Sequence, residues 1–247
     1  MLTAARAQRC LKDAKQYLAT DVDRSLENST RLLDAGIENA EVLHLASTAL
    51  LKKGKYPQAT GLLNKLLDHN TTSIDTYTYL VSCHAATANF SALARLLDRI
   101  QGIDAAGVDW TLLKIRIMNL LKMHAPAAAL CVELVEQEPD NTEFHCMLGW
   151  HYQSLGDLSR AQKSYRAALA INPDTVRALY ALSYLKKWDS EDNNLAALQG
   201  FLQRGAGSES DLTFVYSALG KEYEDIAQYS AAFENFKNSA DLTNKTT

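Results

Sequence analysis

Proline and turn signals are scarce in this chain of 247 residues. It contains only four prolines, and no Asn-Gly or Asp-Gly pair separates alternating apolar runs. These absences argue against hairpins and against an all-β fold. Hydrophobic residues nevertheless make up 47% of the chain, which is too much for a disordered protein. The composition therefore favours a folded protein with almost no strand.

The chain also has no excess of positive charge and no long apolar segment. The formal net charge is −4, whereas a general nucleic-acid binder is normally basic. No stretch is long and apolar enough to cross a membrane. Residues 1–18 mix charged with apolar residues, as in an amphipathic helix and unlike a signal peptide. We therefore expect neither nucleic acid nor a membrane as a partner.

The sequence also lacks the common motifs for nucleotide binding and for metal-dependent catalysis. The chain has no GxxxxGK[ST], GxGxxG or HExxH motif, and its six histidines are scattered. The four cysteines form no CxxC pair, which favours reduced core thiols and a cytoplasmic protein; they are Cys10, Cys83, Cys131 and Cys146. Acidic groups such as Glu222, Glu224 and Asp225 are interpreted as solvated helix faces. The sequence thus predicts no enzyme, no cofactor and no metal site.

One segment has small and large residues at set places. It runs from Thr142 to Thr175, and the places are filled by Leu148, Gly149, Tyr152, Gly156, Ala161, Tyr165, Ala168 and Pro173. This resembles the tetratricopeptide repeat, a helix–turn–helix unit of 34 residues. It departs from that unit at His145, where the repeat has tryptophan.

The spacing of 34 continues on both sides of this segment. From Pro173 it reaches Pro139, and from Ala161 it reaches Ala127 and then Ala59. Repeats are predicted to start near Arg6, Ala40, Ile74, Val108, Thr142, Val176 and, after a slip of three residues, Thr213. Residues 1–247 are thus expected to form a single all-α domain. Its predicted architecture is a right-handed superhelical solenoid of about seven antiparallel helix pairs.

The repeated small residues predict close helix crossings. Gly149 and Gly220 lie in the middle of helices, where glycine costs about 1 kcal/mol relative to alanine. This cost is explained if the paired helix leaves no room for a side chain. Tyr165 and Phe236 are expected to fill the gap to the next repeat. The prolines fit the same scheme, since they lie in the first turns of second helices (Pro57 and Pro126) or just past their ends (Pro139 and Pro173).

The resemblance implies a scaffold that binds a protein or peptide in a concave groove lined by the first helix of each pair. RNA-reading helical repeats are an alternative, but the chain lacks their longer repeat and basic charge. Members of the family that grip a C-terminal carboxylate use a Lys and Asn pair. Here the corresponding places hold Thr78 with Ser82 and Cys146 with Trp150, which argues against such a ligand. The sequence does not indicate an oligomeric state.

Residues 177–243 carry a second, more specific resemblance. They are similar to the region that precedes the catalytic domain in bacterial tetratricopeptide–sulfotransferase fusion proteins. The residues that carry it are Ala218, Leu219, Gly220, Lys221, Tyr223, Glu224, Asp225, Tyr229, Ala232, Phe233 and Phe236. It implies an alternative function, the targeting or substrate-presenting region of such an enzyme. The catalytic domain would begin after residue 247, and no donor-binding loop lies in 1–247, so no catalytic residue can be assigned.

Residues three and four apart on the first helices share a face. The predicted groove is made of aromatic, basic and amide side chains: Arg116, Asn119, Trp150, Gln153, Arg177, Tyr180, Tyr184 and Trp188. Trp, Tyr and Arg dominate binding hot spots. The expected ligand is an extended or helical segment with apolar and acidic side chains. The alternative is that these aromatic residues only pack against the next helix.

Overall fold

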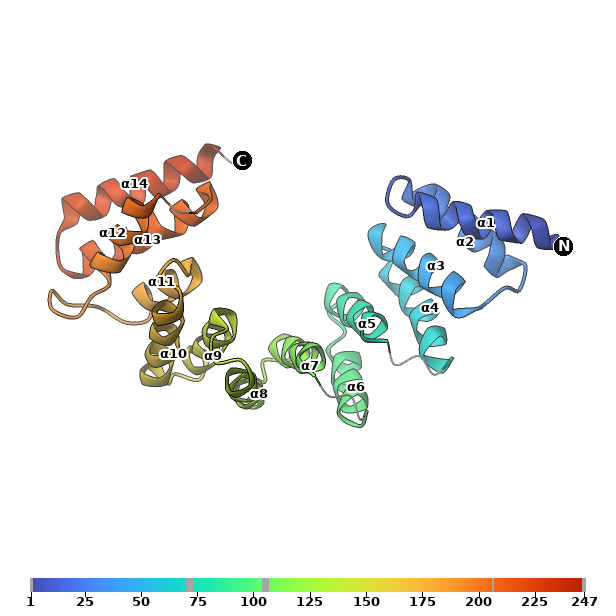
Figure 1. The fold of residues 1–247 in the computed structure, drawn as a ribbon, viewed down its shortest axis with the longest axis horizontal. Coiled ribbons are helices and arrows are strands. Elements are labelled where there is room, and N and C mark those ends of the chain that lie inside the picture. The colour runs from blue at the N-terminus through green and yellow to red at the C-terminus, as the bar shows by residue number, and fades with distance from the viewer. Residues whose placement is uncertain (1, 70–72, 104–106, 206, 246–247) are drawn as a thin grey trace. The chain divides into compact units, whose positions relative to one another are not determined.

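The computed structural model describes residues 2–69, 73–103, 107–205 and 207–245. These residues form 14 α-helices and no β-strand, so the predicted all-α fold is confirmed (Figure 1). The helices are α1 (Ala4–Tyr17), α2 (Val22–Asp34), α3 (Ala40–Lys52), α4 (Tyr56–Asp68), α5 (Ile74–Ala86), α6 (Phe90–Gln101), α7 (Val108–Leu120), α8 (His124–Gln137), α9 (Thr142–Ser154), α10 (Leu158–Ile171), α11 (Val176–Ser183), α12 (Leu195–Arg204), α13 (Glu209–Asp225) and α14 (Tyr229–Lys245). None of the helices in this part of the chain meets the length and hydropathy that a membrane crossing requires.

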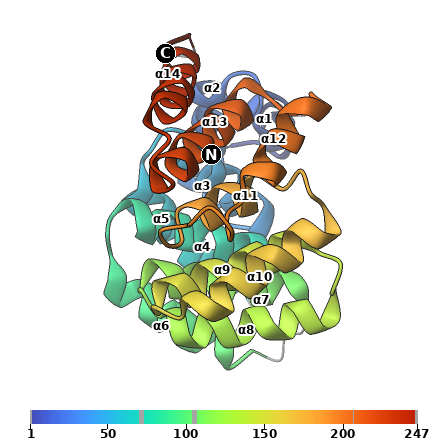
Figure 2. The ribbon, with the colours of Figure 1, turned by 90° about the vertical axis from the view of Figure 1, so that its left-hand side faces the viewer.

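The chain divides into two compact units, residues 1–122 with α1–α7 and residues 123–247 with α8–α14. In the first unit every helix packs on the next one in the sequence. The second unit follows the same rule from α8 to α11, and α13 and α14 lie side by side (Figure 2). Each element thus buries its apolar side against its neighbours, as in a solenoid.

Polar caps determine where the helices begin. Asn39 accepts a hydrogen bond from the Val42 N–H at 2.9 Å, and Asp157 accepts one from the Arg160 N–H at 2.9 Å. Such side chains satisfy N–H groups that have no partner within the helix. The first helices α3, α5, α7, α9 and α11 begin at Ala40, Ile74, Val108, Thr142 and Val176.

The turn inside five of the seven predicted pairs uses one left-handed residue. Gly54 and Gly156 take it with φ of 69° and 78°. Ala88, Lys122 and Ala227 occupy the same place with φ of 50°, 59° and 61°. The left-handed conformation costs a residue with a Cβ roughly 1–2 kcal/mol. Its presence at three such residues indicates that the geometry of the helix pair determines the turn.

Two glycines allow the closest helix crossings, as predicted. A Cβ added to Gly149 would lie 2.6 Å from Cε1 of Tyr165, and one added to Gly220 would lie 2.6 Å from Cδ1 of Phe236. Tyr165 is 1% exposed, as expected for a residue that fills the gap to the next repeat. Phe236 differs, because 37% of it is exposed at the end of the described helices.

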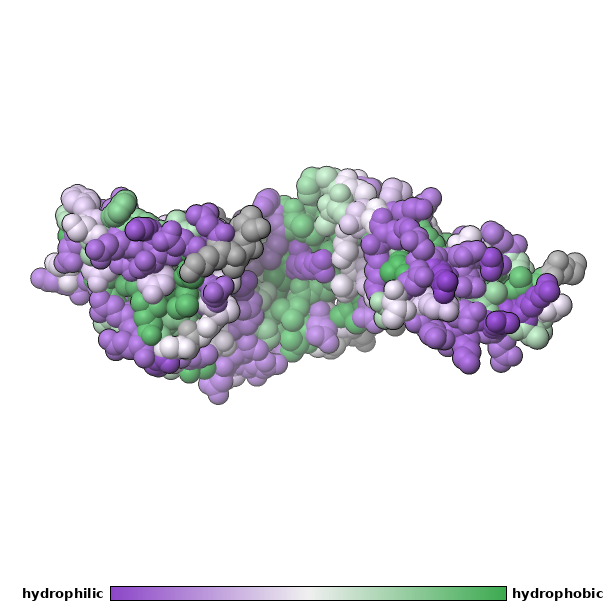
Figure 3. Space-filling model, turned by 90° about the horizontal axis from the view of Figure 1, so that it is seen from above, coloured by the Kyte–Doolittle hydropathy of each residue, from purple (hydrophilic) through white to green (hydrophobic). Residues whose placement is uncertain are grey.

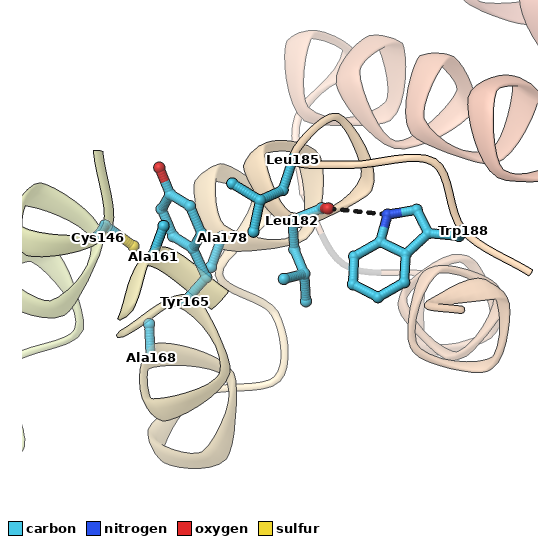
Figure 4. Packing of buried hydrophobic residues seen from close by; sticks show 8 residues of the cluster. All are labelled: Cys146, Ala161, Tyr165, Ala168, Ala178, Leu182, Leu185 and Trp188. Atoms are coloured by element: carbon cyan, nitrogen blue, oxygen red, sulfur yellow. Dashed lines mark hydrogen bonds between the residues drawn. The ribbon is translucent and has the colours of Figure 1, made fainter. Parts of the chain in front are cut away.

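The sixth pair departs from the predicted pattern. Helix α11 has only eight residues and ends at Ser183, so it does not reach Trp188. Trp188 is 2% exposed, and its indole N–H donates to the carbonyl oxygens of Leu182 and Ser183 at 3.1 Å (Figure 4). The prediction that Trp188 lines a groove is therefore wrong. The side chain turns back to satisfy carbonyl groups at the end of α11 and belongs to the core.

The acidic residues of α13 hold the segment that follows α11. Glu222 is fully buried and accepts hydrogen bonds from the backbone N–H of Asn194 at 3.1 Å and from its Nδ2 at 2.7 Å. Asp225 accepts the backbone N–H of Trp188 at 2.9 Å and pairs with Lys221. The interpretation of this acidic group as a solvated face holds only for Glu224, which is exposed. The other two carboxylates anchor the backbone of residues 184–194.

Candidate partner-binding site

Three large aromatic side chains are exposed on the first helices of the second unit. Trp150 on α9 is 42% exposed, Tyr184 at the C-cap of α11 is 38% exposed, and Phe214 on α13 is 46% exposed. Helices α9 and α13 both contact α11. The space-filling view shows hydrophobic surface interrupted by hydrophilic residues on this unit (Figure 3). We call the surface formed by Trp150, Tyr180, Tyr184 and Phe214 the aromatic face.

Contacts between helices order part of the aromatic face. The ring centroids of Tyr180 and Tyr184 lie 4.7 Å apart, and Phe214 meets Tyr180 edge-on at 5.2 Å. The hydroxyl groups of Tyr184 and Ser217 form a hydrogen bond of 2.9 Å. Packing lowers the conformational freedom that these side chains would lose on binding, which favours affinity. These aromatic residues therefore pack between helices, and Tyr184 and Phe214 still expose more than a third of their surface. Their role in binding a partner stays a prediction.

Trp150 is held by histidines. Its ring lies 5.1 Å from that of His124 on α8 and 4.8 Å from that of His151. His151 is fully buried, and neither of its ring nitrogens has a hydrogen-bond partner. Burial, with a smaller contribution from His124, lowers the pKa of His151 from 6.5 to about 4. His151 is thus a neutral core residue at pH 7 that supports the exposed indole.

The polar residues predicted for the groove have partners of their own. Arg177 on α11 forms an ion pair with Glu143 on α9, and both side chains remain more than half exposed. Gln153 is half-buried, and its Oε1 accepts a hydrogen bond from the Tyr165 hydroxyl at 2.9 Å. Arg177 is accessible to a partner, whereas Gln153 mainly fixes the α9–α10 crossing.

The two remaining predicted residues lie on α7 in the first unit. Arg116 is exposed and donates to the Ser82 hydroxyl at 3.2 Å. Together with Asp75, Thr78 and Asp109 it lines an open hollow of about 380 Å³ between α5 and α7. Asn119 is half-buried, and its Oδ1 has no hydrogen-bond partner. The structure thus places Arg116 at a surface hollow and Asn119 nearer the core.

Phe214 was missed by the sequence reasoning. It is the second residue of the last predicted repeat, the same place that Glu143 and Arg177 occupy in the two repeats before it. Repeat numbering that starts again at Thr213, after the slip of three residues, identifies Phe214 as a residue of this face.

The buried cysteines do not provide reactive thiolates at the aromatic face. Burial raises the pKa of Cys131 to about 12 and that of Cys146 to about 11, so both thiols stay protonated at pH 7. All four cysteines are unpaired. Among the described residues, no three His, Cys, Asp or Glu side chains are grouped so that they could hold a metal ion.

Comparison with known proteins supports the repeat assignment. Residues 142–175 match the family model for the tetratricopeptide repeat. No curated protein matches the chain.

Solved structures share the fold at low sequence identity. The C-terminal part of a tetratricopeptide repeat-containing protein from Cytophaga hutchinsonii has a TM-score of 0.65 at 11% identity, with 94% of this chain and 95% of that chain covered. A tetratricopeptide repeat protein from Parabacteroides merdae has a TM-score of 0.59 at 12% identity, with 96% of this chain and 86% of that chain covered. YrrB, described as having an unusual peptide-binding site, has a TM-score of 0.51 at 13% identity, with 85% of this chain and 97% of that chain covered.

These matches do not bear out the resemblance of residues 177–243 to sulfotransferase fusion proteins. What they support is coarser: residues 142–175 form a tetratricopeptide repeat, and the chain has the fold of tetratricopeptide repeat proteins.

Proposed function

We propose that this chain is a protein-binding scaffold and that a segment of its partner lies across the aromatic face. The observation that carries the proposal is the exposure of Trp150, Tyr184 and Phe214 on or at the end of three first helices of one unit. Aromatic side chains are enriched in the cores of protein interfaces and in their hot spots. The chain is expected to act without catalysis and in the cytoplasm.

The charges around the aromatic face suggest which side chains the bound segment of the partner carries. Arg177 and Lys187 are exposed, and Glu143 neutralises Arg177 only in part because both side chains remain solvated. Apolar side chains of the partner would cover the rings, and acidic side chains would meet the two cations at the rim. Opposite charges at a rim mainly increase the association rate and the specificity.

The test begins with peptides selected from a random library on the immobilised chain. Binding of a selected peptide is then measured by titration calorimetry for the wild type and for Trp150→Ala with Tyr184→Ala. Truncating one hot-spot residue costs about 2 kcal/mol, or about 30-fold in Kd. We expect the double variant to lose at least that much, with an unchanged helical spectrum.

A matched control keeps this test specific. Phe90 on α6 and Leu158 on α10 are 53% and 42% exposed on second helices. Phe90→Ala with Leu158→Ala should bind the selected peptide like the wild type. Full binding by a folded Trp150→Ala, Tyr184→Ala variant, or equal loss in the control, would contradict the proposal.

The resemblance of residues 177–243 suggests a second hypothesis. In this hypothesis the chain is the targeting or substrate-presenting region of a sulfotransferase. It predicts that the reading frame continues past residue 247 into a catalytic domain. Sequencing the gene decides this directly, because a stop codon after Thr247 removes the hypothesis.

A further inference from the structure

The hollow between α5 and α7 has a lining of mixed chemistry. Its volume is about 380 Å³, and every residue that lines it belongs to the first unit. The two helices contact each other directly (Figure 1). The lining consists of two carboxylates, three aliphatic side chains and two side chains that donate hydrogen bonds: Asp75 and Asp109; Ile74, Leu112 and Leu113; Thr78 and Arg116. The hollow therefore suits a side chain that is apolar along its length and charged at its end.

The two carboxylates of the hollow have no cation of their own. Asp75 and Asp109 lie in the first turns of α5 and α7, and both are exposed. Neither forms an ion pair with any residue that the structure describes. Arg116 lies seven residues after Asp109, which places it about 10 Å further along α7, and it donates to the Ser82 hydroxyl instead. The positive ends of the two helices favour acids in a first turn, but they leave the carboxylates open to a cation.

The chain supplies cations at the same place in other repeats. The two carboxylates are the second residues of their predicted repeats, as are Glu41 on α3 and Glu143 on α9. Lys15 of α1 pairs with Glu41, and Arg177 of α11 pairs with Glu143. An acid at this place thus meets a cation from a neighbouring first helix in the two outer cases and meets none in the two middle cases. We take this difference as charge complementarity that a partner can complete.

The lining favours a guanidinium group as that cation. The carboxylates come from two helices, and a guanidinium group has five N–H donors in a planar fork, so it can donate to both. The ammonium group of lysine is a compact and strongly hydrated charge without this geometry. The aliphatic side chains of the hollow can cover the methylene groups of an arginine. A metal ion fits less well, because no three potential ligands among the described residues are grouped to hold one.

We infer that the hollow between α5 and α7 binds an arginine side chain of a partner protein, with its guanidinium group between Asp75 and Asp109. The inference rests on the proposed scaffold function and adds a contact in the first unit that is separate from the aromatic face. Arg116 at the same hollow repels a second cation. A single arginine is therefore favoured over a run of basic residues.

Peptide selection on a chain whose aromatic face is disabled tests the inference. The bait is the full chain with Trp150→Ala and Tyr184→Ala, so failure here is distinguishable from failure of the proposed function. Peptides selected from a random library should carry an arginine. Replacing it with citrulline, which has a similar shape and no charge, should weaken binding about tenfold, and lysine should restore only part of the loss. A selection without binders, or binders that keep their affinity with citrulline, would overturn the inference.

Neutral variants of the same bait locate the site. Asp75→Asn with Asp109→Asn should weaken the selected arginine peptide about tenfold with an unchanged helical spectrum, because both side chains are exposed and unpaired. Asp68→Asn with Asp98→Asn is the matched control, since both residues are exposed, on α4 and α6, and the same net charge is removed. The control should bind the peptide like the bait. Equal weakening by the two pairs would show attraction to net charge alone, and full binding by the first pair would place the arginine elsewhere; both results contradict the inference.

Discussion

Gly149 offers a direct measure of how tightly the helix pairs pack. Alanine at this position gains about 0.8–1 kcal/mol in helix propensity, but its Cβ would lie 2.6–2.9 Å from three ring carbons of Tyr165. Tyr165 is buried and held by its hydrogen bond to Gln153, so the ring cannot simply move into solvent. Overpacking of this kind costs about 1–3 kcal/mol. We expect Gly149→Ala to be neutral to destabilising by about 2 kcal/mol.

The chain has a matched control for this substitution. Gly61 also lies in the middle of a helix, α4, and a Cβ added there meets no atom within 4 Å. Gly61→Ala should therefore stabilise its helix by about 0.8–1 kcal/mol. The difference between the two sites isolates the packing cost of about 1–3 kcal/mol.

Amide hydrogen exchange is the suitable assay, because a solenoid need not unfold in one step. It gives local opening free energies for α9 and α10 and, separately, for α4. Tyr165→Leu in the Gly149→Ala background should recover part of the loss, as in a double-mutant cycle. If both alanine variants slow exchange equally, the close crossing at Gly149 is refuted.

Two further predictions concern buried ionisable groups. Glu222→Ala leaves two N–H groups of Asn194 without their carboxylate, so we expect a loss of about 1–3 kcal/mol in the local opening free energy of α13, measured by amide hydrogen exchange. Glu224→Ala, at an exposed position of the same helix, is its control, and equal effects would contradict the anchoring role. The pKa of His151 is lowered from 6.5 to about 4 in the folded chain, so the unfolded state binds its proton more readily. Stability from this group is present above pH 6.5 and is lost as the pH falls towards 4, by roughly 1–3 kcal/mol. A His151→Leu variant whose stability falls as steeply as that of the wild type in this window would show that other groups are responsible.

The all-α repeat fold of this protein can be predicted from its amino-acid pattern alone. Gly149 and Gly220 occupy the same place in two repeats, and a larger side chain there would meet Tyr165 or Phe236. Ala161 recurs as Ala127 and Ala59 at multiples of 34 residues. These contacts lie within one pair or between neighbouring pairs, so the repeat register alone is enough to predict them.

The burial of Trp188 and Glu222, in contrast, depends on contacts between segments that are distant in the sequence. Tyr180, Tyr184 and Trp188 have helical spacing, but Asp225 binds the backbone N–H of Trp188 and the indole turns back onto the carbonyls of Leu182 and Ser183. Glu222 resembled a solvated acid and is buried instead, because it accepts the N–H groups of Asn194. Asp225 lies 37 residues after Trp188, and Asn194 lies 28 residues before Glu222. Local periodicity carries no information about hydrogen bonds formed at such distances along the chain.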